Sequence, residues 1–164
     1  MTHLWTPWRS TYMKAGKDQS RCVFCDAAAS DRDKENLVVF RGQQNFVLLN
    51  RYPYTSGHLM IAPYAHVPRL NDVVEETLAE IARLTRRIEI ILEAAYKPEG
   101  INLGMNLGRA AGAGIADHIH MHMLPRWSGD ANFMTSVAGT RIIPESLDET
   151  YLKIKQGFDM SAQP

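Results

Sequence analysis

Four common features are missing from this sequence, and each absence narrows the class of protein. No apolar run is long enough to span a bilayer, and residues 1–9 lack the apolar core of a signal peptide. The formal net charge is +0, so no excess of basic residues indicates a nucleic-acid or membrane partner. No internal repeat or low-complexity segment is present. We therefore expect a cytoplasmic protein that binds neither nucleic acid nor membranes.

Cysteine is scarce, because Cys22 and Cys25 are the only two in the chain. A disulfide would not persist in the reducing compartment that we expect. The C-x-x-C spacing leaves three interpretations open: a redox pair, buried packing residues or metal ligands. No strand–helix–strand pattern typical of a redox pair surrounds the motif. As metal ligands the thiolates need two partners, because structural zinc is four-coordinate. His66 and His118 are the candidates.

The remaining composition is ordinary for a globular protein. Of the 164 residues, 45% are hydrophobic and 22% are charged, which is enough for a sizeable core. We expect a single domain over residues 1–164. Residues 1–20 contain aromatic side chains without a clear period, and we expect an irregular arm that packs on the domain or on a partner subunit.

Hydrophobic periodicity predicts an α+β fold. Short apolar runs that predict strands occur at residues 37–40, 46–49, 58–63 and 101–107. Over residues 71–97 apolar side chains recur at three- and four-residue steps, which predicts one long amphipathic helix. Residues 145–158 predict a second, C-terminal helix. Together with a strand around the histidines described below, we expect an antiparallel sheet of about five strands with these two helices.

Both ends of the long helix carry sequence signals. Asp72 followed by Glu75 fits a capping box at its start. Pro98 and Gly100 predict that the helix ends before them. We assign this helix to packing rather than to chemistry.

Three of the six histidines stand at alternate positions, as His118, His120 and His122. In a strand these side chains project from one face, and the apolar residues between them project from the other. Pro125 cannot donate a ladder hydrogen bond, so it predicts the end or the edge of that strand. Neutral imidazole is a competent nucleophile near neutral pH. Accidental alternation on a solvated face is the alternative, but three histidines in register after a glycine-rich loop favour chemistry.

The string HIHMHML, from His118 to Leu124, resembles the motif of the histidine triad (HIT) superfamily. Its flanks, NLG and AGAGI before it and PRW and GDANFM after it, resemble the bacterial branch that includes diadenosine tetraphosphate phosphorylases. Asn50 and Gly57-His58 also fit this pattern, and the resemblance covers most of the chain. It implies a HIT-like fold and a homodimer that joins sheets and helices.

The resemblance implies catalytic roles for the three histidines. The enzyme would be a nucleotidyl transferase or hydrolase that acts on dinucleoside polyphosphates through a covalent nucleotidyl-His120. The backbone carbonyl of His118 would fix the His120 ring, and His122 would bond a non-bridging or leaving oxygen. Water as the second acceptor gives a hydrolase, and inorganic phosphate gives a phosphorylase. No organic cofactor is implied.

The resemblance also implies substrate-binding residues. Asn50 would bond the ribose hydroxyls, residues near Phe40 and Leu48 would wall the base pocket, and His58 would lie near the phosphates. Asn50 could equally be a turn residue, and His58 a satisfied histidine at a strand end. Residues that would hold developing negative charge are Asn106 and the backbone amides from Gly112 to Gly114. Such glycine-rich backbone can approach an anion closely.

HIT proteins with this C-x-x-C commonly bind zinc. The implied ligands are Cys22, Cys25, His66 and His118, and four protein ligands leave no open position, so the zinc would be structural. The sequence departs from many members of the superfamily just before the triad. Ala113-Gly114-Ile115 stand where many members carry Gln with Ser or Thr. The alternatives are therefore a nucleoside phosphoramidate hydrolase, a nucleotide sensor with little turnover, and a zinc-stapled interaction module.

Overall fold

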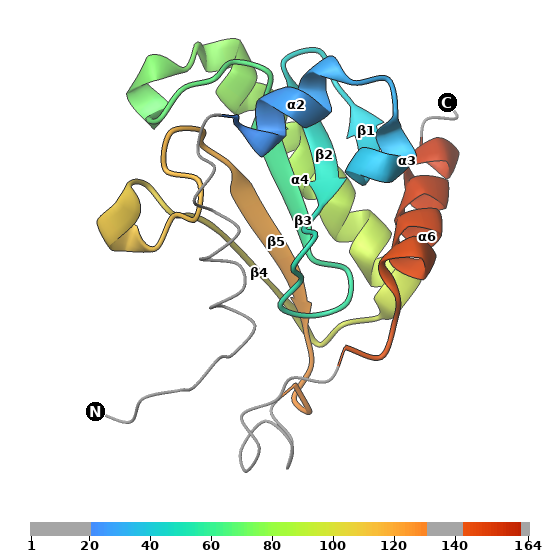
Figure 1. Ribbon diagram of the computed structural model, residues 1–164. Coiled ribbons are helices and arrows are strands. Elements are labelled where there is room, and N and C mark those ends of the chain that lie inside the picture. The colour runs from blue at the N-terminus through green and yellow to red at the C-terminus, as the bar shows by residue number, and fades with distance from the viewer. Residues whose placement is uncertain (1–20, 131–142, 162–164) are drawn as a thin grey trace, which may run out of the picture.

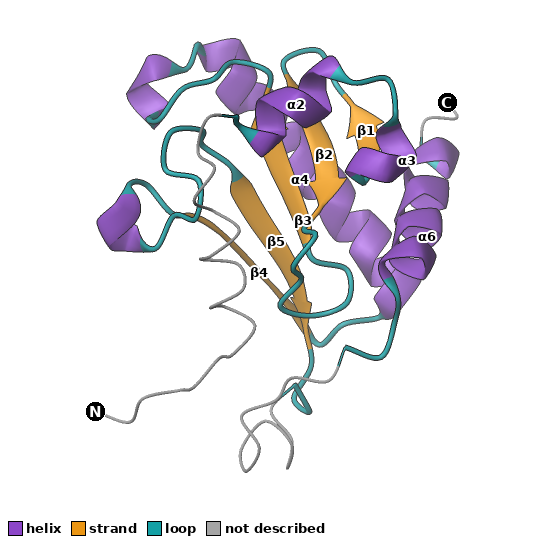
Figure 2. Cartoon of the chain, viewed as in Figure 1, coloured by secondary structure: helices purple, strands orange, loops and turns teal. Residues whose placement is uncertain are grey.

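The computed structural model describes residues 21–130 and 143–161. Five antiparallel strands form a sheet in the order β1-β2-β3-β5-β4, as Figure 1 shows. The strands are β1 (Val38–Arg41), β2 (Asn45–Leu49), β3 (Leu59–Pro63), β4 (Gly100–Met105) and β5 (Met121–Arg126). The helices, purple in Figure 2, are α2 (Val23–Ala29), α3 (Asp33–Asn36), α4 (Glu75–Tyr96) and α6 (Leu147–Met160). The predicted α+β fold is confirmed, and the predicted arm at residues 1–20 lies outside the described residues.

β1 and β2 form a hairpin because a short turn joins two apolar runs. The carboxylate of Glu80 on α4 accepts hydrogen bonds from the backbone N–H groups of Gln43, Gln44 and Asn45, each at 2.8 Å. It thereby satisfies donors at the turn and fixes the turn against α4. Every residue of β2 and of β3 is buried, because the sheet is covered on both faces at this point.

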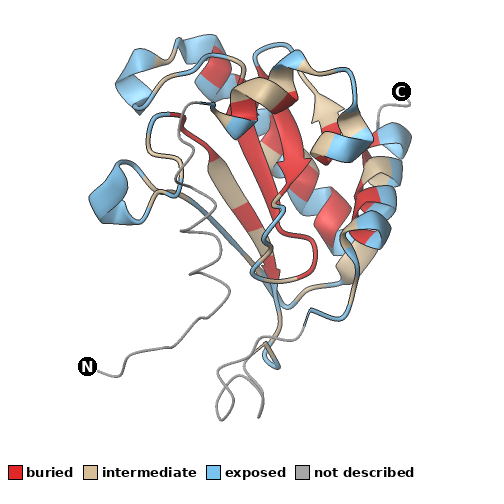
Figure 3. Ribbon diagram, in the orientation of Figure 1, coloured by how far each residue is buried: buried red, intermediate tan, exposed pale blue. Residues whose placement is uncertain are grey.

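Two apolar layers lie on opposite faces of the sheet. One layer packs α4 and α6 against the sheet through fully buried side chains that include Ile88, Leu92 and Ile154. The other packs α2 against the sheet, chiefly through Phe24, which is 1% exposed. Figure 1 shows α2 in front of the strands and α4 behind them, and Figure 3 shows burial concentrated in β2 and β3. The α2 face carries the histidines.

α4 begins later than the sequence predicts. Leu70–Asp72 form a separate 3-10 turn, and α4 starts at Glu75 with Val74 as its N-cap and no side-chain cap. The predicted capping box of Asp72 and Glu75 is therefore wrong, because Val73 and Val74 have extended backbone between the turn and the helix.

The other end of α4 lies at Tyr96, where Lys97 takes the left-handed conformation with φ 47°. The helix thus ends before Pro98 and Gly100, as predicted, and Gly100 is the first residue of β4. The apolar positions that are buried as predicted are Ile81, Leu84, Ile88 and Ile91. Val74 and Leu78 continue the same apolar period toward the start of the predicted helix, but both are exposed. The inner side of the first turns is formed by Thr77 and Glu80, which bond to Asn45.

β5 begins at Met121, so only His122 of the three histidines lies within the strand. The prediction of a strand that starts at residue 118 is wrong, because the N–H of Ile119 bonds to the carbonyl of Val67 in a loop rather than to a neighbouring strand. Pro125 lies inside β5 at a position that pairs with β4 but lies beyond the paired part of β3. It is thus at a local edge, as predicted.

α6 lies where the sequence predicts the C-terminal helix. Ser146 and Glu149 form a capping box at its start. The side chains that α6 buries include Tyr151, Ile154 and Phe158. At the opposite side of the fold, β4 is an edge strand whose Leu103 is 58% exposed. No helix in the described ranges combines the length and the apolar character needed to cross a bilayer.

Candidate active site and metal cluster

The three histidines lie on the α2 face of the sheet. His122 of β5 pairs with Met60 of β3, and Met60 pairs with Leu48 of β2. Directly opposed residues of antiparallel strands point to the same face, so these side chains form one row. Leu48 therefore lies where a wall of the base pocket is expected. Phe40 does not, because it stacks on Phe158 of α6, at 4.9 Å between ring centroids, on the opposite face.

His120 is held by the backbone two residues before it. Its Nδ1 lies 2.9 Å from the carbonyl oxygen of His118, and its side chain is 5% exposed. A carbonyl only accepts, so Nδ1 carries the proton of the neutral ring. Burial lowers the pKa of His120 and so favours that neutral form. Nε2 is left unprotonated, which is the form that a nucleophilic imidazole requires.

His58 and His122 form a hydrogen-bonded pair. Nε2 of His58 lies 2.9 Å from Nδ1 of His122, and the backbone N–H of Tyr54 donates to Nδ1 of His58 at 3.2 Å. Burial, with His122 and His120 nearby, lowers the pKa of His58 to about 3, and burial with His120 lowers that of His122 to about 4. Both rings are thus neutral at pH 7. Since Nδ1 of His58 accepts, Nε2 of His58 donates to His122, and Nε2 of His122 is left as a donor.

Asn50 shapes the loop that precedes His58. Its Oδ1 accepts the N–H of Tyr52 at 2.9 Å, and its Nδ2 lies 3.4 Å from Nδ1 of His58. The first contact is an Asx turn, which is the structural role expected of a polar residue at a strand end. Asn50 thus lies beside the histidine pair, and its contact with a ribose stays a prediction.

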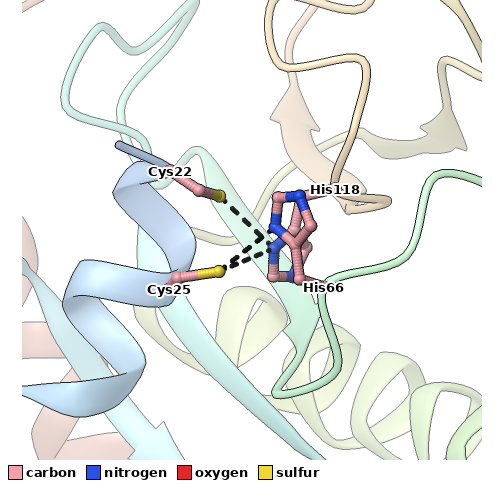
Figure 4. Close-up of side chains that lie close together, drawn as sticks. All are labelled: Cys22, Cys25, His66 and His118. Carbon is pink, nitrogen blue, oxygen red and sulfur yellow. Dashed lines mark hydrogen bonds between the residues drawn. The ribbon is translucent and has the colours of Figure 1, made fainter. Parts of the chain in front are cut away.

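A cluster of four side chains lies next to the triad. Each of Cys22, Cys25, His66 and His118 brings one ligand atom, all within 4.8 Å of one another, and Figure 4 shows both sulfurs facing the two rings. Sγ of Cys25 lies 3.2 Å from Nδ1 of His66, and Sγ of Cys22 lies 3.4 Å from Nδ1 of His118. Nε2 of His118 lies 2.9 Å from the carbonyl of Pro63, which leaves Nδ1 open to a metal.

The donor set of this cluster fits a metal ion. Two thiols with two imidazoles are a usual set for structural zinc. Burial, together with the nearby Cys22, raises the pKa of the Cys25 thiol to about 11. A bound cation would offset the repulsion between the two sulfurs and deprotonate them. His118 also links the cluster to His120, because its ring belongs to the cluster and its carbonyl holds the neighbouring ring.

Comparison with known proteins gives the family. The HIT domain model matches residues 31–129 of the chain. The chain belongs to the HIT family. This match includes the three histidines and His58, whereas Cys22, Cys25 and α6 lie outside it.

Individual relatives of this HIT protein agree with the match. The AP-4-A phosphorylase of Mycobacterium tuberculosis is 38% identical over 158 residues, which cover 92% of this chain and 80% of the relative. The bis(5'-adenosyl)-triphosphatase of Dictyostelium discoideum is 28% identical, over 57% of this chain and 62% of the relative. Among solved structures, a zinc-bound histidine triad family protein from Mycobacterium smegmatis matches with a TM-score of 0.69 at 27% identity, over 85% of this chain and 94% of that one.

The loop between β4 and β5 of this HIT protein carries the remaining predicted residues. Asn106 directly follows β4, and Gly112 ends a 3-10 turn with φ 90°. The N–H of Gly112 is used within that turn, because it donates to the carbonyl of Arg109 at 3.0 Å. Among the described residues, no hydrogen bond joins Asn106, Gly112 or Gly114 to the triad. Their predicted role in holding negative charge stays a prediction.

Sequence reasoning missed Phe24, which belongs to the site. Its ring lies 5.1 Å from that of His118 and 4.8 Å from that of His120, measured between centroids. Phe24 stands between Cys22 and Cys25, so the motif drew attention to the cysteines alone. The only signal for it was an apolar residue inside a C-x-x-C, which is too common to predict contact with a histidine far along the chain.

Proposed function

We propose that this HIT protein cleaves dinucleoside polyphosphates by nucleotidyl transfer through a covalent nucleotidyl-His120. The observation that carries the proposal is the hydrogen bond from Nδ1 of His120 to the His118 carbonyl, which leaves Nε2 as a fixed nucleophile. The AP-4-A phosphorylase and the bis(5'-adenosyl)-triphosphatase among its relatives support the substrate class.

In the first step, Nε2 of His120 attacks the α-phosphorus. A bond from nitrogen to phosphorus forms, and the bond from phosphorus to the bridging oxygen breaks. The leaving nucleoside polyphosphate takes the electron pair of the broken bond. The His120 ring becomes an imidazolium whose Nδ1–H still donates its hydrogen bond to the carbonyl of His118. Nε2–H of His122 donates to a phosphate oxygen and stabilises the charge that develops there. One such donor contributes about 3 kcal/mol to transition-state stabilisation in comparable sites.

In the second step an acceptor oxygen attacks the same phosphorus and releases His120. Water as the acceptor gives a nucleoside monophosphate and makes the protein a hydrolase. Inorganic phosphate as the acceptor gives a nucleoside diphosphate and makes it a phosphorylase. Two displacements through a covalent intermediate are the general advantage of a histidine nucleophile.

Product analysis with diadenosine tetraphosphate tests this proposal. The protein is incubated with and without inorganic phosphate, and the nucleotides are separated. ATP and ADP that appear only with phosphate identify a phosphorylase, and AMP with ATP in its absence identifies a hydrolase. Bound nucleotide without turnover contradicts the proposal and favours a sensor or another adenylylated substrate, such as a nucleoside phosphoramidate.

The cluster of Cys22, Cys25, His66 and His118 is proposed to hold one structural zinc ion. Its support is the convergence of four ligand atoms within 4.8 Å and the zinc-bound family member from M. smegmatis. Bound there, zinc would join α2 to the loop after β3 and to the residues before β5. It would have no open coordination position, so it supplies no step of the reaction.

The exposed edge of the sheet is proposed to pair with a second copy of the chain. Among the described strands none pairs with the outer side of β4, and Leu103 of β4 is 58% exposed. Unpaired strand edges with apolar neighbours favour association. We expect a dimer in analytical ultracentrifugation, and Leu103→Lys to shift it toward monomer. A wild-type monomer at micromolar concentration would contradict the pairing.

A further inference from the structure

We propose that Phe24 is a positioning residue for His120, and that α2 is anchored at both ends to keep the Phe24 ring in place. The inference rests on the proposed function, because it takes His120 as the nucleophile. It concerns a residue of α2 whose ring packs against the ring of the nucleophile.

The ring of His120 has three neighbours that restrict its rotation. Nδ1 is bonded to the carbonyl of His118 at 2.9 Å. The ring of His122 lies 4.8 Å away at an interplanar angle of 75°, and the ring of Phe24 lies 4.8 Å away at 38°. A single hydrogen bond fixes one edge of an imidazole but permits it to tilt. Phe24 supplies the contact that opposes this tilt, and both side chains are buried, with Phe24 1% and His120 5% exposed.

The N-terminal end of α2 is anchored at the metal cluster. Cys22 precedes the helix and Cys25 lies in its first turn, so Phe24 stands between the two cysteines in the sequence. Phe24 also lies against the ring of His118, at 5.1 Å between centroids. The same four residues that would hold the metal therefore set the position of Phe24 above the sheet.

The C-terminal end of α2 is anchored by Arg41 of β1. Its guanidinium donates to the backbone carbonyls of Ala27, Ala28 and Ser30 at 2.9, 2.9 and 2.6 Å. It also forms a salt bridge with Asp33 at 2.8 Å. These carbonyls are the ones that a helix leaves unsatisfied at its end, so the side chain replaces the missing turn. A helix of seven residues thus has a fixed attachment at each end.

A small movement of the His120 ring matters because in-line attack requires the nitrogen to lie on the axis of the breaking bond. Displacement of a reacting group by about 1 Å can slow a reaction by about 100-fold. Phe24 packs in one apolar cluster with Leu48 and Met60, so its loss also loosens the wall beside them. The positioning role is therefore read from kcat and from the state of the His120 ring, not from KM.

The test compares Phe24→Leu with the matched control Phe46→Leu. Phe46 is fully buried in the same apolar cluster, and it stacks on Tyr64 rather than on a histidine. Both changes remove a buried ring and lower the melting temperature. With diadenosine tetraphosphate at saturating concentration, we expect Phe24→Leu alone to lower kcat by about tenfold or more. Equal effects of the two variants on kcat would overturn the inference.

A second measurement does not depend on turnover. Long-range proton–nitrogen NMR spectra at fixed pH report which ring nitrogen of His120 carries the proton. Wild type and Phe46→Leu are expected to show the single Nδ1–H form, and Phe24→Leu to show shifts averaged between the two tautomers. If diadenosine tetraphosphate is not a substrate, this spectrum still decides the role of Phe24, and an unchanged His120 signal in Phe24→Leu would overturn it.

Arg41→Lys loosens the C-terminal anchor without touching the ring or the metal ligands. Lysine keeps the charge but not the fork that reaches several carbonyls at once. We expect unchanged metal content, a kcat between those of wild type and Phe24→Leu, and partial averaging of the His120 signal. Wild-type values for both kcat and the NMR signal would show that the anchor has no part in positioning Phe24.

Discussion

At the scale of single residues, the protein gives each histidine a different role by fixing which ring nitrogen carries the proton. The carbonyl of Pro63 accepts a hydrogen bond from Nε2–H of His118, which leaves Nδ1 for the metal cluster. The carbonyl of His118 accepts a hydrogen bond from Nδ1–H of His120, which leaves Nε2 free to attack. Backbone groups whose donor or acceptor character cannot change therefore set the chemistry of the rings.

Replacing the nucleophile tests the central residue. His120→Gly is expected to lower turnover of diadenosine tetraphosphate by roughly three orders of magnitude or more, because no other described group offers an unprotonated nitrogen at that position. Nucleotide binding and the far-UV circular dichroism spectrum should stay as in wild type. Intact-mass spectrometry of wild type with substrate should show an added nucleotidyl group that the variant lacks. Retained turnover in His120→Gly would rule out the proposed intermediate.

The pair of His58 and His122 predicts a pH dependence of stability. The pKa of His58 falls from its ordinary value of 6.5 to about 3, and that of His122 to about 4. Below pH 6.5 the unfolded chain therefore binds more protons than the folded protein. The free energy of unfolding falls as the pH falls from 6.5 toward 4, by at most about 1.4 kcal/mol per pH unit for each ring.

Urea unfolding at several pH values measures this slope. His58→Asn keeps an acceptor for the Tyr54 N–H but removes one titrating ring, so its slope between pH 6.5 and 4 should be shallower than that of wild type. Both proteins keep Cys22, Cys25, His66 and His118, so the contribution of that cluster to the slope is the same in each. Identical slopes would mean that His58 is already protonated, or is not buried, in the folded protein.

The residues of the metal cluster were predictable only when the C-x-x-C motif was combined with the resemblance to the HIT family. The C-x-x-C alone left three interpretations open, and His66 and His118 were selected by resemblance. Contact between Cys22 and His118 spans 96 positions of the chain, and no local pattern encodes such a distance. The pairing of His58 with His122 was missed for the same reason, since it depends on the register between β3 and β5.

At the scale of elements, α4 supports the sheet through one charged contact as well as through its apolar side. Glu80 receives three backbone N–H groups of the β1–β2 turn and the side-chain amide of Asn45. Burial by itself raises the pKa of Glu80, but the bonds from Asn45, Gln43 and Gln44 outweigh it and lower the pKa. The turn and the helix therefore form one unit.

Glu80→Gln is expected to lower the free energy of unfolding by about 2 kcal/mol, because hydrogen bonds to a charged acceptor are lost and a new NH₂ group faces the N–H of the turn. The matched control is Glu76→Gln, at an exposed position one turn earlier on the same helix. It should change stability by less than about 0.5 kcal/mol. Equal losses of unfolding free energy in the two variants would show that the contact of Glu80 with the β1–β2 turn contributes nothing beyond surface charge.

Element types were predictable, and element ends were less so. The apolar runs and the helical period gave all five strands, α4 and α6, because burial selects those patterns directly. The start of α4 was misplaced because Asp72 with Glu75 looks like a cap, whereas the chain stays extended at Val73 and Val74. The start of β5 was misplaced because alternation continues through residues that bond to a loop.

At the scale of the whole molecule, the metal cluster ties together three distant parts of the chain. Cys25→Ser or chelation is expected to remove one metal ion per chain and to lower the melting temperature by at least about 5 °C, because metal binding stabilises only the folded state. The control Val23→Ser introduces a serine at a neighbouring exposed position, and it should change neither the metal content nor the melting temperature. Metal analysis with thermal unfolding checks both, and equal melting of metal-loaded and metal-free protein would contradict a structural role.

The strand order has a consequence for synthesis on the ribosome. β4 pairs with β5 and with no other described strand, although β4 is made first. Until β5 has emerged, both β3 and β4 present an unpaired edge, and neither the metal cluster nor the histidine pair can form, since each needs residues from 118 onward. The nascent chain therefore completes its first strands and α4 well before it can acquire a site, and a chain that terminates before β5 exposes two edges to other chains.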